Sequence, residues 1–100
     1  MKFHIGDIAS ITTNKLLSPT KMEGIYNILN FLTGDELWTH ELPFASDFVK
    51  PYLLEQYPKL ANINAQNINV NNVQEKVDEL IAEYGEYLEI TSVSEHWQQQ

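Results

Sequence analysis

Side chains that could carry out chemistry are few in this chain and are spread along it. Three histidines, His4, His40 and His96, are the only candidates for an imidazole base or ligand, and their spacing matches neither HxxxH nor HExxH. A metal site built from His40 with Asp35 and Glu41 would require tertiary convergence that the sequence does not indicate. We therefore interpret the histidines as structural or surface residues and predict no metal site.

Nucleophiles and phosphate-binding loops also lack a signature. Ser18, Ser46 and the pair Thr12-Thr13 lie in no GxSxG elbow. The chain has no cysteine, which excludes thiol catalysis, disulfides and thiolate metal sites. Its four glycines never cluster into a loop that could bind a phosphate. We predict that the protein is not an enzyme and uses no cofactor.

The strongest candidate for a functional surface is the stretch GDELWTHEL, residues 34–42. Loops between helices carry binding residues disproportionately, and tryptophan is a frequent anchor at protein interfaces. The candidate contact residues are Asp35, Glu36, Trp38, His40 and Glu41. The competing interpretation, which we prefer for the tryptophan itself, is that Trp38 closes the core between the flanking helices.

The charge balance limits the class of partner. Fourteen acidic residues face six lysines and no arginine, so the formal net charge is −8. Direct nucleic-acid binding is disfavoured, because phosphate contacts by Lys and Arg supply most of its affinity. No apolar run reaches the roughly 18 residues that suggest a membrane span, and the segment MKFHIGD lacks the apolar stretch of a secretory signal. We expect a cytoplasmic protein without membrane contact.

A second candidate surface is an acidic ladder in the C-terminal third. Glu75, Glu79 and Glu83 follow one another at i, i+4 with Asp78 beside them. Like charges at this spacing destabilise a helix by about 0.2–0.5 kcal/mol per pair. Either the ladder presents carboxylates to a basic groove on a partner, or it only keeps the protein dispersed in water, which is the interpretation we prefer.

Ser18 to Gly34 is expected to form the central helix. Ser18 can cap its start, Pro19 suits its first position, and Gly34 can adopt the left-handed conformation that ends it. Apolar residues cover more than half of its circumference: Met22, Ile25, Tyr26, Ile28, Leu29, Phe31 and Leu32. Such a helix needs neighbours on two sides, and since a chain of 100 residues offers few, we expect a homodimer.

Gly24 lies inside this helix, where glycine costs about 1 kcal/mol relative to alanine. The glycine either permits the close approach of another backbone or is a tolerated defect. The sequence leaves both interpretations open.

The N-terminal segment should supply one strand and one short helix. Lys2 to Ile5 alternates polar and apolar residues, as a strand does. A helix from Ile8 to Thr13 would be capped by Asp7 and ended by Asn14. The β-branched run Ile11-Thr12-Thr13 leaves a strand as the alternative.

Residues 35–42 are expected to be a loop or a short edge segment, followed by a helix from Phe44 to Tyr57. Pro51 falls inside that helix. Since proline lacks a backbone donor and its ring clashes with the preceding turn, the helix should bend or divide near Lys50.

The last third begins with an asparagine-rich connection, residues 61–72, because asparagine favours turns. A helix over residues 71–84 and a strand over residues 86–93 should follow, with residues 2–5 as the strand's partner. Residues 95–100 are expected to be a frayed tail.

Together these elements predict an α+β fold. We expect one mostly helical domain over residues 1–100, with three to four helices and a small antiparallel β element joining the N-terminal and C-terminal segments.

Three segments of the chain, FHIGDIASITTNKLLSP, GIYNILNFLTGDELWTHELPFASD and KPYLLEQYPKL, carry a family resemblance. In this order they resemble a family of small, functionally uncharacterised proteins of tailed bacteriophages, with the pattern GDIxSxTT, GxYxILNFxTGD and THxLP over about residues 3–60. The resemblance implies phage origin and expression in the bacterial cytoplasm, and it supplies no catalytic residues. The family often has an arginine after the LP pair, where this chain has Phe44.

The leading hypothesis is a small acidic accessory protein, encoded by a phage, that binds and modulates a host protein. An inhibitor of a host defence or nucleic-acid-processing machine would fit this description. The alternative is a self-assembling structural protein without a host target.

Overall fold

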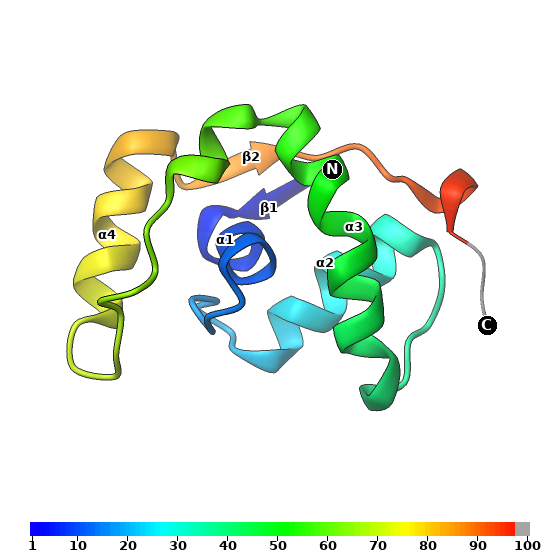
Figure 1. Cartoon of the computed structure of the whole chain (residues 1–100), viewed down its shortest axis with the longest axis horizontal. Coiled ribbons are helices and arrows are strands. Elements are labelled where there is room, and N and C mark those ends of the chain that lie inside the picture. The colour runs from blue at the N-terminus through cyan, green and yellow to red at the C-terminus, as the bar shows by residue number, and fades with distance from the viewer. Residues whose placement is uncertain (98–100) are drawn as a thin grey trace.

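This computed structural model describes residues 1–97 of the chain. These residues form four α-helices, a two-stranded antiparallel sheet and the turns and loops that join them (Figure 1). The helices and strands are β1 (Lys2–His4), α1 (Ile5–Thr13), α2 (Met22–Thr33), α3 (Leu42–Gln56), α4 (Val73–Tyr84) and β2 (Tyr87–Glu89). The 3₁₀ turns are η1 (Thr39–Glu41), η2 (Pro58–Asn62) and η3 (Ser94–His96). The predicted α+β, mostly helical fold class is confirmed.

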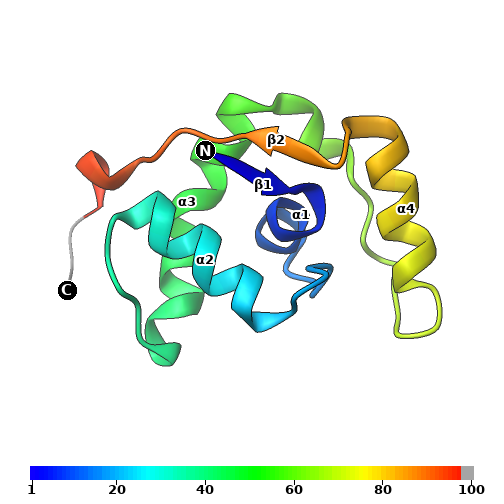
Figure 2. The same cartoon turned by 180° about the vertical axis from the view of Figure 1, so that it is seen from behind.

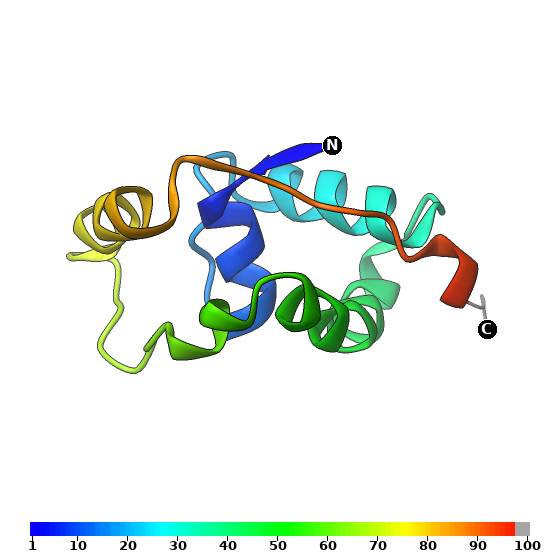
Figure 3. The ribbon, with the colours of Figure 1, turned by 90° about the horizontal axis from the view of Figure 1, so that it is seen from above.

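The sheet joins the two ends of the chain, as the sequence predicts. Strand β1 pairs with β2 in antiparallel register, with Phe3 opposite Leu88. Strand β2 ends at Glu89, however, whereas the alternation in the sequence continues to Val93. The reason is that the following backbone bonds to other partners: the Thr91 N–H donates to Gln56 Oε1 over 2.9 Å, and the Val93 N–H donates to the Leu32 carbonyl over 3.0 Å. The segment after β2 therefore runs lengthwise across the molecule toward the C-terminus (Figures 1 and 3).

Helix α1 is enclosed by the rest of the molecule and contacts the other three α-helices. Every residue from Ile5 to Thr12 is buried, so the strand alternative for this segment is wrong. The buried Ser10 hydroxyl of this helix has two hydrogen-bond partners. Ser10 Oγ donates to the Gly6 carbonyl over 2.7 Å and accepts from the Leu17 N–H over 2.7 Å. The helix ends at Asn14 in the left-handed conformation, as predicted.

Two predicted helix caps are wrong. Helix α1 begins at Ile5, and its cap is His4, whose Nδ1 accepts from the Gly6 N–H over 2.9 Å. Asp7 therefore lies within the helix, and Ser18 lies outside α2. Instead of capping separate helices, the two buried side chains bond to each other, with Ser18 Oγ donating to Asp7 Oδ1.

Helix α2 begins at Met22, three residues after Pro19, the predicted first position, and ends at Gly34 with φ 71°, as predicted. Its start follows Lys21, whose φ of 56° and ψ of −129° are strained for a residue with a side chain. The turn before α2 is closed by the Lys21 N–H, which donates to the Ser18 carbonyl over 3.1 Å, and the Ser18 side chain is bonded to Asp7.

One continuous core fills the space between the helices. Its fully buried large side chains are Ile5, Ile8, Ile11, Leu17, Ile28, Leu29, Leu32, Val49, Leu53, Leu60 and Ile90. The inner face of α2 is thus covered by α1 and α3 of the same chain. The argument that this helix needs a second subunit does not hold for its buried face.

Helix α3 passes through Pro51 without interruption, so the predicted division is wrong, and the alternative, a bend near Lys50, stays a prediction. Pro51 lies on the exposed face of the helix. It is α3 that carries Gln56, whose amide both donates to and accepts from the Thr91 backbone.

The connection between α3 and α4 has neither helix nor strand from residue 63 to residue 72. Its asparagines close turns: Asn72 Nδ2 donates to the Asn67 carbonyl over 2.7 Å, and Asn72 Oδ1 accepts from the Asn69 N–H over 2.8 Å. At the C-terminal end, residues 94–96 form η3 and Trp97 is half-buried, where the sequence predicts a frayed tail. The rest of that tail, residues 98–100, lies outside the described residues.

Replacing Leu29 with alanine tests the position of α2. The side chain is fully buried, so the substitution should lower the free energy of unfolding by about 2–5 kcal/mol. Urea unfolding followed by circular dichroism measures the change. Asn27→Ala, on the exposed face of the same helix, is the control and should shift stability by less than about 0.5 kcal/mol. A loss below about 1 kcal/mol at Leu29 would contradict this core.

Gly24→Ala tests the contact between α2 and the Asp7–Ser18 pair. A Cβ at Gly24 would collide with Ser18 Oγ and Asp7 Oδ1 and lie 2.7 Å from Thr20 Oγ1, so the glycine is not a tolerated defect. We expect a loss of about 1–3 kcal/mol, where an open helix position would gain about 1 kcal/mol. In a double-mutant cycle with Ser18→Ala, the second substitution should cost less than it does alone. Additive effects would show that the two residues do not touch.

Candidate partner-binding surface

The loop between α2 and α3, residues 35–41, is fixed by hydrogen bonds from its own backbone. The Leu37 N–H donates to Asn30 Oδ1 on α2 over 3.0 Å. The Trp38 N–H donates to Glu41 Oε1 over 2.9 Å, and the Glu41 N–H donates to the Trp38 carbonyl over 2.9 Å. This reciprocal pair closes η1 in the manner of a capping box.

Trp38 points away from the core. Its side chain is 70% exposed, so the prediction that it closes the space between the helices is wrong. The neighbouring Leu37 is buried instead and does the closing. Since η1 is also tied to α2 by a hydrogen bond between the Tyr26 and Thr39 hydroxyls, the loop presents an apolar indole on a fixed backbone.

The other predicted contact residues of this loop differ in their surroundings. Glu36 and His40 are exposed, whereas Glu41 is half-buried and bonded to the Trp38 backbone. Asp35 is also half-buried, and its Oδ2 accepts from Trp97 Nε1 over 3.2 Å. Asp35 and Glu41 therefore position the loop, and Glu36, Trp38 and His40 are the side chains that it presents.

An aromatic cluster beside this loop was missed by the sequence analysis. The Trp97 ring lies 5.5 Å from Phe44 and 5.2 Å from Phe48, measured between ring centroids. Phe44 is 51% exposed, so the cluster adds a second exposed aromatic side chain, on α3. The signal was present in the sequence, because a tryptophan in a frayed tail would leave its large apolar surface in water.

The acidic ladder lies on α4 as predicted, and Glu75, Asp78, Glu79 and Glu83 are all exposed. Two neighbours reduce its cost: Lys76 Nζ lies 3.3 Å from a Glu79 carboxylate oxygen, and Gln74 Nε2 donates to Asp78 over 3.0 Å. Burial, with the adjacent Glu83 carboxylate, raises the pKa of Tyr84 above its usual 10.0. At neutral pH the Tyr84 hydroxyl therefore keeps its proton and anchors α4 by donating to the Lys59 carbonyl over 2.9 Å.

The structure does not bring the two candidate surfaces together. Helix α4 lies at one end of the molecule, and the loop after α2 lies toward the other (Figures 1 and 2). The long axis measures 37 Å. The loop and the ladder could therefore act only as separate sites.

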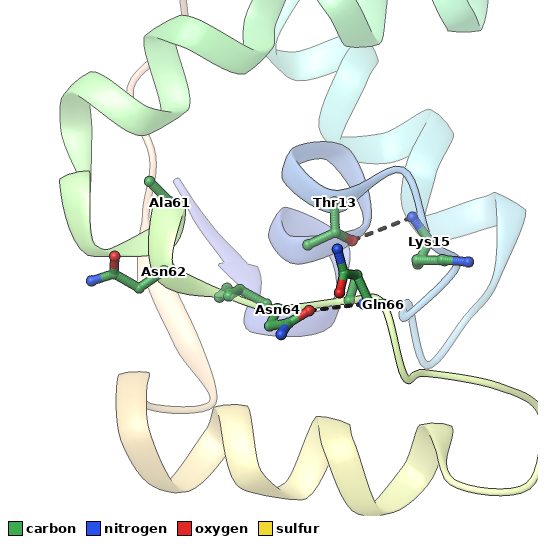
Figure 4. A pocket seen from close by; sticks show the side chains of 8 residues that line it. Thr13, Lys15, Ala61, Asn62, Asn64 and Gln66 are labelled. Carbon is green, nitrogen blue, oxygen red and sulfur yellow. Dashed lines mark hydrogen bonds between the residues drawn. The ribbon is translucent and has the colours of Figure 1, made fainter.

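A shallow pocket of about 600 Å³ lies between the end of α1 and residues 61–66 (Figure 4). Two of its polar side chains bond to nearby backbone: Thr13 Oγ1 accepts from the Lys15 N–H over 3.3 Å, and Asn64 Oδ1 accepts from the Gln66 N–H over 3.0 Å. These bonds shape turns, and the pocket contains none of the predicted contact residues.

Metal binding would require a cluster of ligating side chains, and membrane insertion would require a long apolar helix. Within residues 1–97, no three His, Asp or Glu side chains gather closely enough to hold a metal ion. Over the same residues, none of the helices combines the length and apolar character needed to cross a bilayer.

A family model described as a domain of unknown function, DUF7736, matches residues 3–63. Comparison with curated proteins and with solved structures gave no match. The matched segment runs from β1 through α3 and η2, so it includes the loop 35–41 and excludes α4.

Fluorescence tests the different environments of the two tryptophans. In Trp97→Phe the emission comes from Trp38 alone, and it should be that of a water-exposed indole, quenched strongly by acrylamide because Trp38 is 70% exposed. In Trp38→Phe the remaining Trp97 should be quenched several-fold less. Trp38→Phe should also change the free energy of unfolding by less than about 0.5 kcal/mol. Equal quenching of the two variants would contradict the placement of Trp38.

Proposed function

This chain belongs to the DUF7736 family, and from that premise we propose that it is a non-enzymatic accessory protein that binds a host protein through the loop 35–41. The host is bacterial and the site of action is its cytoplasm, because the GDIxSxTT, GxYxILNFxTGD and THxLP segments resemble proteins of tailed bacteriophages. Binding would modulate the activity of the host protein.

The observation that carries this proposal is the exposure of Trp38 on a loop whose backbone is already ordered. The indole is 70% exposed, while hydrogen bonds to Asn30 and Glu41 hold the residues around it. Tryptophan is among the residues most enriched at the energetic centres of interfaces. A loop that is ordered before binding loses little conformational entropy in the complex, so more of the contact energy appears as affinity.

Charge around the indole indicates the chemistry of the partner. Glu36 is exposed beside Trp38, and the whole chain carries a net charge of −8. Such a surface attracts a basic face and accelerates encounter with it. The partner would therefore present an apolar pocket with Lys or Arg side chains around it. Proteins that handle nucleic acid carry basic surfaces of this kind. The proposed target class is a host defence or nucleic-acid-processing machine.

The rival function is self-assembly, in which a second copy of the chain covers the exposed apolar surface. Trp38 and the half-exposed Phe44 are the side chains that such a contact would bury. The two functions predict different behaviour of the purified protein, because self-assembly would occur without any host component.

Affinity capture with matched baits tests the proposal. The wild-type chain should retain a host protein from lysate in stoichiometric amount. Trp38→Ala should weaken the binding of that protein about 30-fold or more, the effect of losing at least 2 kcal/mol at an interface anchor. The triple variant Glu75→Gln/Glu79→Gln/Glu83→Gln should capture it normally if the ladder is only a solvated surface.

Met22→Ala, an exposed apolar residue at the start of α2 and away from the loop, is the control and should bind as the wild type does. Unchanged capture by Trp38→Ala would refute the loop as the binding surface, and loss of capture by the triple variant would move the site to α4. Recovery of the bait alone, with a dimeric or larger mass that Trp38→Ala abolishes in light scattering, would favour self-assembly.

A further inference from the structure

A groove of about 830 Å³ lies between α4 and the turn that precedes α2. Its helical wall is formed by Val73, Val77 and Ile81, which follow one another at i, i+4 and i+8 along α4. Leu16 and Leu17 form the facing wall. The groove is thus an apolar channel beside a helix. Helix α4 and the loop 35–41 lie toward opposite ends of the molecule (Figure 1).

Charged groups of opposite sign stand on the two sides of this channel. Lys15 and Lys21 come from the turn, and Asp78 and Glu86 come from α4 and the residue before β2. Lys21 is the residue held with φ 56°, so the direction of its side chain is set by a strained backbone. The groove can therefore distinguish ligands by where their charges lie.

We propose that this groove binds an amphipathic helix of a partner protein. The apolar stripe of that helix packs on Val73, Val77 and Ile81, its acidic edge faces Lys15 and Lys21, and its basic edge faces Asp78 and Glu86. The site is independent of the loop 35–41, so the protein would be an adaptor with one contact surface at each end.

A helix suits the groove better than an extended peptide does. The lining side chains come mainly from α4 and from the turns at residues 15–21 and 68–70, and strand β1 contributes only His4. A strand edge running along the groove, which an extended peptide would need for its backbone bonds, is therefore not part of this lining. A helix satisfies its own backbone hydrogen bonds and needs only side-chain contacts. Val73 to Ile81 spans about 12 Å, which is the length of roughly two turns of a helix lying alongside.

Exposed apolar side chains at the edges of the groove favour a macromolecule over an enclosed small molecule as its ligand. Leu16 is 49% exposed and Val70 is 90% exposed, and both line the groove. A compact ligand within the channel would leave these side chains in water. A helix lying along the channel would cover them and remove the exposed apolar area.

Two synthetic peptides test the proposal with the full chain. Both are labelled 16-residue helices with the same leucine stripe and the same net charge. The first has Glu along one edge and Lys along the other, and the second has Glu and Lys alternating along both edges. The wild type should bind the first peptide about 2- to 30-fold more tightly, the range for two exposed charge contacts. Fluorescence anisotropy at low salt measures both affinities. Lys15→Glu/Lys21→Glu should abolish the preference, because the Glu edge of the first peptide then faces acidic groups on the turn.

Substitutions on the rims separate this site from the loop 35–41. Leu16→Ser and Val70→Ser should each weaken both peptides several-fold without unfolding the protein, since both side chains are exposed. Phe44→Ser, an equally exposed apolar site elsewhere, and Trp38→Ala should leave peptide binding unchanged.

Several results would overturn the proposal. These are failure of both peptides to bind at millimolar concentration, equal affinity for the two peptides, or loss of binding in Trp38→Ala. A bound anilinonaphthalenesulfonate dye that neither peptide displaces would make the groove a small-molecule site. Since the host protein is captured through Trp38 and the peptides through Val70 and Leu16, failure of either proposal would leave the other standing.

Discussion

The buried hydrogen bond between Ser18 and Asp7 is the contact on which the arrangement of the helices depends. It joins the enclosed helix α1 to the turn before α2, and the pair packs against Gly24 so closely that no side chain would fit there. The Leu17 carbonyl oxygen packs just as closely against Gly6 of α1, where a Cβ would also collide with it. Because a buried carboxylate without its donor is costly, this junction admits one geometry. The strained backbone of Lys21 lies three residues after Ser18, where this turn meets the start of α2.

Both proposed binding surfaces follow from that junction. The turn fixed by Ser18 forms one wall of the groove beside α4, and it carries Lys15 and Lys21. Helix α2, which the same junction orients, carries Asn30 and Tyr26, the residues that hold the loop around Trp38. A single buried contact thus positions an apolar groove and an exposed indole on opposite sides of the core.

The sequence predicts those elements whose local signals agree. The apolar face of α2 and its stop at Gly34, the end of α1 at Asn14, and the pairing of the two strands all follow from periodicity and turn chemistry. The errors arise where tertiary contacts replace local ones. Ser18 and Asp7 are good caps, but each finds a buried partner in the other. Trp38 and Trp97 exchange their expected environments, because Leu37 fills the core and the C-terminal segment returns along the molecule to pack on α3. No local pattern encodes that return path.

Partner binding through the loop 35–41 requires that the backbone around Trp38 is ordered before any partner binds. ¹⁵N relaxation of the amides of Leu37, Trp38 and Glu41 measures this order, because these three N–H groups make the bonds that fix the loop. We expect order parameters of about 0.85, the value of rigid backbone. Order parameters below about 0.6 in the free protein would show that the loop is ordered only on binding, and would rule out a preformed binding surface.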